Sequence, residues 1–236
     1  MTHDEIKQTM IWAGRVLVNE GQDDFTRGHI SMRLPDDPGL FFMKSHSVGL
    51  DEITMENIVT VNLEGVKVGG EGKRHSEVFI HSEIFKARND VQCVLHTHPT
   101  YAIALSSSGG KLHAYSQPAV LFYESLGLYD DTINLIRTTD MGAGVAKALG
   151  NARAVLLKNH GVVVTATTIA ELVVSTIMLE SAAMIQMITQ AAGTPAAEFP
   201  RADIEKLRHD ISRPEQFQIN FDYLVRRAKR MRGATS

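Results

Sequence analysis

Two histidines that follow a short apolar segment constrain the fold of this chain more than any other feature. Residues 91–95 are followed by His96-Thr97-His98-Pro99. Side chains two residues apart on a strand point to the same side of the sheet, so His96 and His98 are expected to lie next to each other. Pro99 cannot donate a ladder hydrogen bond and is expected to end the strand. The segment therefore predicts a pair of metal ligands at the end of a buried strand.

A third histidine, His160, follows a second apolar segment, Ala154–Leu157, and Glu77 opens the amphipathic segment that precedes the first one. Three imidazoles with a fourth position that is open or filled by a carboxylate are typical of a catalytic divalent metal site. One His-x-His pair is a weak signal, because buried histidines are often only hydrogen-bonded core residues. Both histidine sites, however, follow apolar strands, and α/β folds place their ligands at strand ends.

The size and charge of the chain limit its class. A chain of 236 residues with 44% hydrophobic content can bury one sizeable core, and no linker divides it, so residues 1–236 are expected to form a single domain. The formal net charge of -3 comes from interspersed acidic and basic residues, which argues against a nucleic-acid partner. The one basic cluster, residues 226–232, is expected on a solvated face of a terminal helix.

The N-terminal residues have neither a basic region nor an apolar run, and no uninterrupted apolar stretch approaches about 18 residues. A cytoplasmic protein without a membrane segment is therefore expected. The single cysteine, Cys93, excludes an internal disulfide. It has the opposite strand parity from His96 and His98, so it is expected in the core on the other face of the sheet.

Capping residues and apolar periodicity predict four helices. They run from Thr2-x-x-Glu5 to Gly21, from Ser76 over residues 78–85, from Thr139 or Asp140 to Gly150, and from Thr168-x-x-Glu171 to about Gly193. The Thr-x-x-Glu pattern is that of a capping box. Ser76 is expected to cap its helix, with Glu77 and His81 on one side of it. The last helix is apolar nearly all round, so it is expected to be buried on several sides, by the domain or by a neighbouring subunit.

Strand signals lie between these helices. Residues 29–34 alternate in polarity, residues 35–39 form a turn, and residues 40–43 resume the strand, which is a hairpin pattern. A further strand is expected at residues 58–63. Because strand and helix signals alternate only loosely, the predicted fold class is α/β, with a mixed sheet flanked by helices.

The order of these motifs resembles the class II aldolase/adducin family. The resemblance rests on Ser76-Glu77 before a helix, on His96-x-His98, and on the segment Asn159-His160-Gly161, and it extends from the first helix to the long helix after His160. It implies a three-layer α-β-α fold whose central sheet is mixed and largely antiparallel. It also implies a homotetramer with active sites at the subunit boundaries.

The resemblance further implies one divalent metal ion per subunit, held by His96, His98 and His160. Glu77 would be the fourth ligand of the resting site and the catalytic acid/base. Zinc is expected first, with manganese, cobalt or iron as alternatives. From the residues alone, Glu77 has a second interpretation as a carboxylate that interacts favourably with a helix N-terminus. His81 is expected beside the ligands or as a packed core histidine.

A cation held by three imidazoles chelates two neighbouring substrate oxygens and withdraws electron density from the carbon between them. Carbon–carbon cleavage then passes through a metal-bound enolate, and Glu77 is expected to protonate the carbon. Decarboxylation and aldol cleavage share this enolate, so the metal site does not separate them. The expected function is a metal-dependent lyase that acts on a small molecule.

The chain departs from the family's sugar-phosphate enzymes at the phosphate site. Those enzymes carry a Gly-Asn-x-Ser turn, a Ser-Gly loop and a Ser-Ser pair. The corresponding residues here are His29, Lys44 with His46, and His75 with Ser76. Small donors suit a phosphate, whereas cationic or imidazole groups suit a carboxylate or a flat aromatic acid. These five residues are expected to bind the substrate, and the chain resembles the decarboxylase branch that acts on hydroxylated aromatic acids.

Three interpretations follow. The first is decarboxylation of a non-phosphorylated hydroxy, oxo or hydroxyaromatic acid. The second is aldol cleavage or epimerisation of a sugar phosphate or a related hydroxy-carbonyl compound, with Lys44 only a surface lysine and His46 only a loop residue. The third is an adducin-like protein with the same fold and no catalysis, which would be expected to have lost metal ligands. All three histidines and Glu77 are present here.

Overall fold

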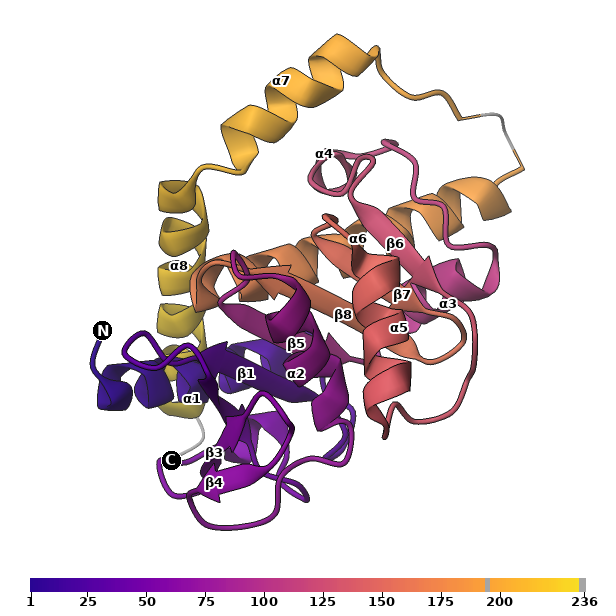
Figure 1. The fold of residues 1–236 in the computed structure, drawn as a ribbon. Coiled ribbons are helices and arrows are strands. Elements are labelled where there is room, and N and C mark those ends of the chain that lie inside the picture. Colours follow the sequence, from indigo (N-terminus) through magenta and orange to yellow (C-terminus); the bar gives the residue numbers. More distant parts are fainter. Residues whose placement is uncertain (194–195, 234–236) are drawn as a thin grey trace.

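The computed structural model describes residues 1–193 and 196–233. An eight-stranded sheet in the order β4-β3-β2-β1-β5-β8-β7-β6 runs through its centre (Figure 1). The strands are β1 (His29–Arg33), β2 (Leu40–Lys44), β3 (Ile58–Asn62), β4 (Lys67–Gly69), β5 (Cys93–Thr97), β6 (Leu126–Tyr129), β7 (Ala154–Leu157) and β8 (Gly161–Ala166). Only β6 and β7 pair in parallel; the other neighbours are antiparallel. The predicted mixed, largely antiparallel sheet is confirmed.

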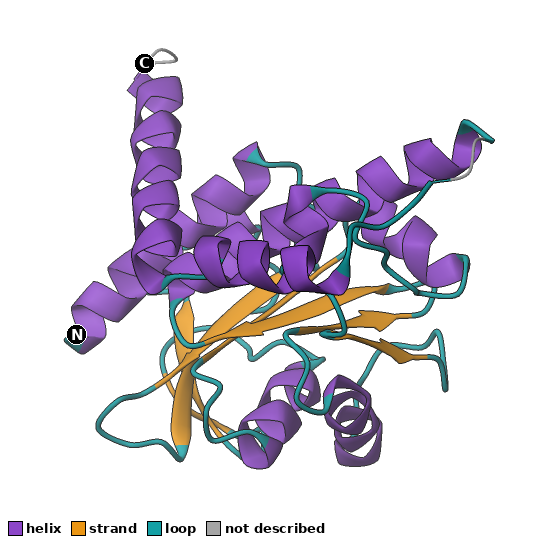
Figure 2. Ribbon diagram, turned by 90° about the horizontal axis from the view of Figure 1, so that it is seen from above, coloured by secondary structure: helices purple, strands orange, loops and turns teal. Residues whose placement is uncertain are grey.

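Helices lie on both sides of this sheet. They are α1 (His3–Asn19), α2 (Val78–Ala87), α3 (Thr100–Ser107), α4 (Gln117–Val120), α5 (Thr139–Leu149), α6 (Ile169–Ala191), α7 (Arg201–Ile211) and α8 (Pro214–Gly233), with a 3₁₀ turn, η1 (Leu50–Glu52). Figure 2 shows helices on both sides of the sheet. Apolar side chains of α1, α3, α6 and α8 pack on one face, and those of α2 and α5 pack on the other. The chain therefore has the three-layer α-β-α architecture.

Most local predictions are confirmed. Thr2 caps α1 in a capping box in which the Glu5 N–H donates to Thr2 Oγ1 at 3.3 Å and the Thr2 N–H donates to Glu5 Oε2 at 2.7 Å. Helix α5 begins at Thr139 and ends before Gly150. The hairpin β1–β2 forms, and β5 ends before Pro99. Local patterns were sufficient for these elements because their caps and turns lie within the same stretch of chain.

Two capping predictions were wrong in detail. Ser76 does not cap α2: the N-cap position is Glu77, and no side chain makes a capping hydrogen bond there. At α6, Thr168 accepts from the Glu171 N–H at 3.1 Å as predicted, but the Glu171 carboxylate does not return to Thr168. It accepts instead from the Thr167 N–H at 3.0 Å and pairs with Arg153. The carboxylates of Glu77 and Glu171 both interact with residues distant in sequence: Glu77 accepts from the Ile136 N–H, and Glu171 pairs with Arg153.

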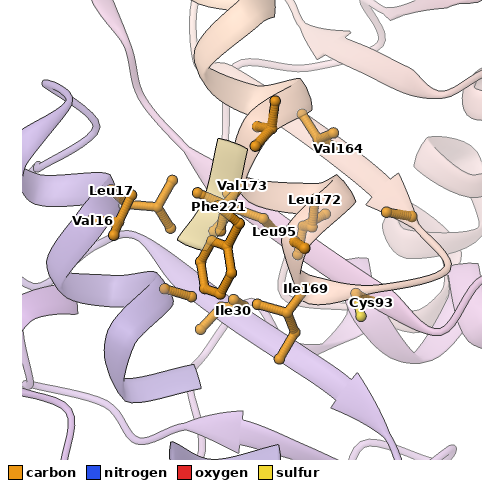
Figure 3. Packing of buried hydrophobic residues seen from close by; sticks show 14 of the residues in the cluster. Val16, Leu17, Ile30, Cys93, Leu95, Val164, Ile169, Leu172, Val173 and Phe221 are labelled. Carbon is orange, nitrogen blue, oxygen red and sulfur yellow. The ribbon is translucent and has the colours of Figure 1, made fainter. Parts of the chain in front are cut away.

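Helix α6 is long and strongly apolar. It has 23 residues and a mean hydropathy of 1.6 over its most apolar window, which is long and apolar enough to cross a membrane by length and composition alone. Half of that window is buried inside the fold. Figure 3 shows Ile169, Leu172 and Val173 of α6 packed with Leu95 and Phe221. This packing agrees with the predicted burial on several sides.

Strand parity decides which residues reach which face. Cys93 and Leu95 of β5 lie in the core under α6, and Val94 lies in the core under α2. His96 has the parity of Val94, so it points to the α2 side, opposite Cys93 as predicted. His29 pairs directly with His96 across β1 and β5. Two of the candidate site residues are therefore neighbours on the same face of the sheet.

Candidate metal centre

The three histidines predicted as metal ligands lie together. One nitrogen of each lies within 4.8 Å of one nitrogen of each of the others. The ring centroids of His96 and His98 are 4.5 Å apart, and the ring of His160 lies 5.1 Å from His96 and 5.2 Å from His98. His96 belongs to β5, His98 to the connection from β5 to α3, and His160 to the turn from β7 to β8.

The turn that carries His160 is shaped by its two neighbours. Asn159 has a φ of 59°, a left-handed conformation that asparagine tolerates better than most residues, and its N–H donates to Ser106 Oγ of α3 at 3.0 Å. A Cβ atom on Gly161 would lie 2.5 Å from the carbonyl oxygen of Thr97 and 2.9 Å from Cδ2 of His98. Only glycine permits this close approach, so Gly161 brings the β7–β8 turn against the other two histidines.

A hydrogen bond on His96 and an ion-pair contact on His98 engage the outer nitrogen of each ring and leave the inner nitrogen available. His96 Nδ1 lies 3.0 Å from the carbonyl oxygen of Val162, to which it donates, and its buried Nε2 has no hydrogen-bond partner among the described residues. His98 Nδ1 lies 2.6 Å from Asp24 Oδ2. Both contacts select the tautomer whose Nε2 carries a lone pair, the usual arrangement around a bound metal. Sequence reasoning missed Asp24, which lies in a loop without a recognisable motif.

His160 supports the same interpretation. Neither of its buried ring nitrogens has a hydrogen-bond partner among residues 1–193 and 196–233. An unpaired polar atom in a protein interior is costly, and a metal ion would remove that cost. The three residues therefore fit a divalent ion.

A second group of potential ligands overlaps the first. His29, Glu77 and His96 also place their ligand atoms within 4.8 Å of one another. His96 has only one free nitrogen, because its Nδ1 is bonded to Val162. The two groups are therefore alternatives for one ion. The contact of Asp24 with His98 favours the three-histidine group.

Glu77 lies at the edge of this cluster and is 2% exposed. Its Oε1 accepts from the Ile136 N–H at 2.9 Å and lies 3.8 Å from His160 Nε2. Its Oε2 lies 3.9 Å from His29 Nε2. Burial raises the pKa of Glu77, an effect opposed by the Ile136 hydrogen bond and by the charges of Arg137 and Arg27. A carboxyl group in this environment is suited to hold and release a proton.

Burial also keeps the clustered imidazoles neutral. It lowers the pKa of His98 to about 4 and the pKa of His75 and His81 to about 3. It lowers the pKa of His29 and His96 well below the usual value. A metal ligand must be a neutral imidazole, so the neutral forms of His96 and His98 suit an ion at neutral pH.

These shifts predict that the metal-free protein loses stability in acid. A histidine whose pKa is lowered by folding stabilises the protein above its unfolded pKa of about 6.5, and this stability is lost as the pH falls toward the folded value. For His81 alone the loss between pH 7 and pH 5 is on the order of 2 kcal/mol. Urea unfolding at several pH values should show this dependence. His81→Gln should reduce it, and His209→Gln, an exposed histidine on α7, should not.

The structure brings together three of the five predicted substrate residues. The ring of His75 lies 4.0 Å from His29 and 5.3 Å from His46, so the three imidazoles form a row from the exposed His46 to the buried His29. Ser76 is half-buried and makes no side-chain hydrogen bond with this row. Lys44 is completely buried, and its ammonium group donates to the carbonyl oxygens of Thr26, at 3.0 Å, and Val48. Burial lowers the pKa of Lys44 to about 8.

The positive charges of two arginines, Arg27 and Arg137, lie close enough to lower the pKa of Glu77. Arg27 pairs with Asp24, the residue that contacts His98. Arg137 is exposed and directly follows Ile136, whose N–H binds Glu77. The guanidinium group of Arg137 forms neither a hydrogen bond nor an ion pair with any described residue, in contrast to the ammonium group of Lys44. Sequence reasoning missed both arginines because their loops carry no regular pattern.

Comparison with known proteins identifies the family of the chain. The family described as "Class II Aldolase and Adducin N-terminal domain" matches residues 8–187. Decarboxylase NovR of Streptomyces niveus is 31% identical over 186 residues, which cover 78% of this chain and 68% of the relative. The 3,4-dihydroxyphthalate decarboxylase of Arthrobacter keyseri is 25% identical over 223 residues, 88% of each chain.

A solved structure of L-fuculose 1-phosphate aldolase from Glaciozyma antarctica superposes with a TM-score of 0.84. It is 27% identical in sequence, and the match covers 98% of this chain and 90% of that one. The fold and the family inferred from Glu77 and the three histidines are thus confirmed.

Proposed function

Because this chain belongs to the class II aldolase and adducin family, we propose that it is a lyase that decarboxylates a non-phosphorylated hydroxy, oxo or hydroxyaromatic acid with the help of a divalent metal ion. Decarboxylases and an aldolase among its relatives support lyase chemistry. The observation that carries the choice of reaction is the row of imidazoles, His29, His75 and His46, at the positions where the family's sugar-phosphate enzymes carry small donors.

His96, His98 and His160 would hold the ion, and Glu77 is a candidate fourth ligand of the resting site. The family uses divalent metals; for this chain we propose zinc, with manganese, cobalt or iron as alternatives. When bound, such an ion acts as a Lewis acid that draws electron density from the carbon between two substrate oxygens.

The protein's own residues would bind the acid and move one proton. The carbon–carbon bond to the departing carboxylate breaks, carbon dioxide leaves, and the electron pair stays on the substrate carbon. The protonated Glu77 then delivers its proton to that carbon. No base is needed for the departing fragment, so one buried acid/base group is sufficient. Burial raises the pKa of Glu77 above its ordinary value and so favours the protonated form that this step requires.

Arg137 is proposed to attract and orient a substrate carboxylate. It is exposed, and no described residue neutralises it by an ion pair. The backbone of Arg137 lies close to Glu77, because the N–H of the preceding residue, Ile136, donates to the Glu77 carboxylate. Arginine suits a planar carboxylate because its guanidinium donates two parallel hydrogen bonds. We assign to Arg137 the cationic role that the sequence predicted for Lys44, whose ammonium group is already bonded to backbone carbonyls.

Arg137→Gln is therefore expected to weaken binding of acids by roughly 1–3 kcal/mol, the value of a charge-assisted hydrogen bond. KM should rise accordingly, and Arg137→Lys should restore part of the affinity. Steady-state kinetics at two salt concentrations would measure the effect. Arg213→Gln, a change at an exposed arginine between α7 and α8, is the control. Equal KM values for Arg137→Gln and the control would show that Arg137 does not contribute to substrate binding.

The reaction itself is tested with a panel of substrates and metal-reconstituted protein. The panel should contain hydroxylated benzoic and phthalic acids, aliphatic hydroxy and oxo acids, and sugar phosphates. Carbon dioxide release from an acid, without release of an aldehyde or ketone, is the expected result. A sugar phosphate as the best substrate would favour the aldolase alternative, which is supported by the structural similarity to a fuculose-phosphate aldolase.

We also propose that residues 1–236 act as one domain and that four copies assemble into a homotetramer. The apolar surface that α6 leaves uncovered supports this assembly: Ile188 near its C-terminal end is 57% exposed. An apolar side chain of this size on a largely buried helix is consistent with a subunit contact. The cytoplasmic location and the absence of nucleic-acid and membrane partners stay predictions.

A further inference from the structure

A buried chain of hydrogen bonds leads from the metal centre into α2. His29 Nδ1 lies 2.6 Å from His81 Nε2, and His81 Nδ1 lies 2.6 Å from Ser31 Oγ. All three side chains are completely buried. His29 and Ser31 are two residues apart on β1, so both point to the face of the sheet that α2 covers. His29 also pairs with His96 across β1 and β5, which places its ring beside the ligands.

The three side chains can share their hydrogens in only two directions. In the first, the Ser31 hydroxyl donates to His81, His81 donates from Nε2 to His29, and the remaining hydrogen of His29 is on Nε2. In the second, His29 donates from Nδ1 to His81, His81 donates from Nδ1 to Ser31, and His29 Nε2 carries a lone pair. The tautomer of His29 therefore depends on which direction the structure favours.

Two observations favour the first direction. His29 Nε2 lies 3.9 Å from a carboxylate oxygen of Glu77, and a hydrogen facing that oxygen is favourable where a lone pair would be repelled. The second direction would also leave the hydroxyl hydrogen of Ser31 without an acceptor, because Ser31 Oγ has no other hydrogen-bond partner among the described residues. The hydrogen of a buried hydroxyl group nearly always has a hydrogen-bond acceptor.

We propose that Ser31 and His81 hold His29 as the tautomer with hydrogen on Nε2, and that His29 donates this hydrogen to an anionic substrate oxygen beside Glu77. The second half of the proposal rests on the proposed function. The distance of 3.9 Å to Glu77 is too long for a direct hydrogen bond. The buried Nε2 has no hydrogen-bond partner in the described part of the chain. Its hydrogen is thus available to an added oxygen.

This arrangement selects for a class of substrate. A single fixed donor next to Glu77 suits a carboxylate oxygen or the oxygen that gains charge as the carbon–carbon bond breaks, and a fixed donor aimed at developing charge lowers the barrier. A phosphate carries three anionic oxygens and is usually bound by several small donors. His29 would be a catalytic residue because it touches the substrate, and His81 and Ser31 would be positioning residues.

The tautomer can be observed without any turnover. Solid-state ¹⁵N NMR of metal-free protein labelled at histidine, with His29→Gln to assign the signals, should show a hydrogen on Nε2 of His29 and none on its Nδ1. Addition of zinc should shift the signals of His96, His98 and His160 and leave the hydrogen of His29 Nε2 in place. A His29 Nε2 without hydrogen in the metal-free protein would overturn the proposal. Displacement of this hydrogen by zinc would also overturn it and would identify His29 as a metal ligand.

Variants of His81 test the positioning role. His81→Gln keeps an N–H where Nε2 was, whereas His81→Phe keeps the ring shape and removes every hydrogen bond. His81→Phe is expected to mix the two tautomers of His29 and to lower kcat about tenfold at unchanged zinc content, and His81→Gln should restore both. Ser31→Ala gives a milder test of the same kind if His81→Phe does not fold. Equal kcat values and equal ¹⁵N spectra for all these variants would refute the positioning role.

The outcome separates this inference from the proposed function. If the predicted tautomer is observed but only sugar phosphates are turned over, the decarboxylase function fails, and with it the second half of the inference. If acids are decarboxylated but His29→Phe loses less than tenfold in kcat, the decarboxylase function stands and His29 is not the donor. The expected loss for His29→Phe is about 10²–10³-fold, as for other fixed donors to a developing anion.

Discussion

Replacement of Glu77 by glutamine is expected to lower kcat by about 10²–10⁴-fold while the protein stays folded and still binds substrate. The carboxyl group is 2% exposed, accepts from the Ile136 N–H at 2.9 Å and lies within 4 Å of two imidazoles. Glutamine keeps the size of the side chain and its acceptor oxygen, so the Ile136 hydrogen bond survives. What glutamine lacks is a proton that it can deliver to carbon.

The measurement compares kcat, KM and metal content of Glu77→Gln with those of the wild type. Glu64→Gln, the same chemical change at an exposed residue after β3, is the control for the substitution itself. A rate loss of less than tenfold would leave Glu77 only the role of a carboxylate at the start of α2. If Glu77→Gln binds zinc more weakly but has the wild-type rate once it is saturated with zinc, Glu77 acts as a ligand and not as the proton carrier.

His96→Ala and His160→Ala are each expected to abolish turnover together with stoichiometric metal binding. Each replacement removes one of three imidazoles and leaves too few ligands for a tight divalent site. Chelation should likewise abolish the activity of the wild-type protein, and re-addition of the metal should restore it. Metal analysis after dialysis, with His209→Ala as the control at an exposed histidine of α7, measures the effect.

Asp24 provides a graded version of the same test. It contacts His98 Nδ1 at 2.6 Å and is not one of the three residues proposed to hold the ion. Asp24→Asn is therefore expected to weaken metal affinity by about 10–100-fold, less than removal of a ligand. If His96→Ala and His160→Ala both fold normally and keep their full metal content, the three histidines are not the ligands.

The proposed ligands could be identified in the sequence because they lie at the ends of regular elements, and the structure brings them together. His96 and His98 needed only the period of a strand, and His160 needed only the end of an apolar run. The resemblance to the family, which rests on the order of these motifs, implied the three layers. What the local pattern could not supply was strand β8, which pairs with β5 and places the turn carrying His160 against the other two histidines.

The residues that were missed or misjudged depend on tertiary contacts. Asp24 and Arg137 lie in irregular loops that the fold brings to the cluster. Lys44 was expected to meet the substrate, but it has the strand parity of Phe42, which packs on the face opposite His29, and its ammonium group is bonded to two carbonyl oxygens. Glu83 of α2 is only 9% exposed because α5 packs closely on α2 at Gly142. Most of these contacts join residues that are distant in the sequence, so no periodic pattern of residues indicates them.

Anomalous diffraction from crystals of zinc-reconstituted protein tests the proposed metal centre most directly. The predicted result is one zinc peak per chain between the ring nitrogens of His96, His98 and His160, with Glu77 adjacent. A peak bound instead by His29, Glu77 and His96, or fully loaded protein without a peak at the three histidines, would contradict it.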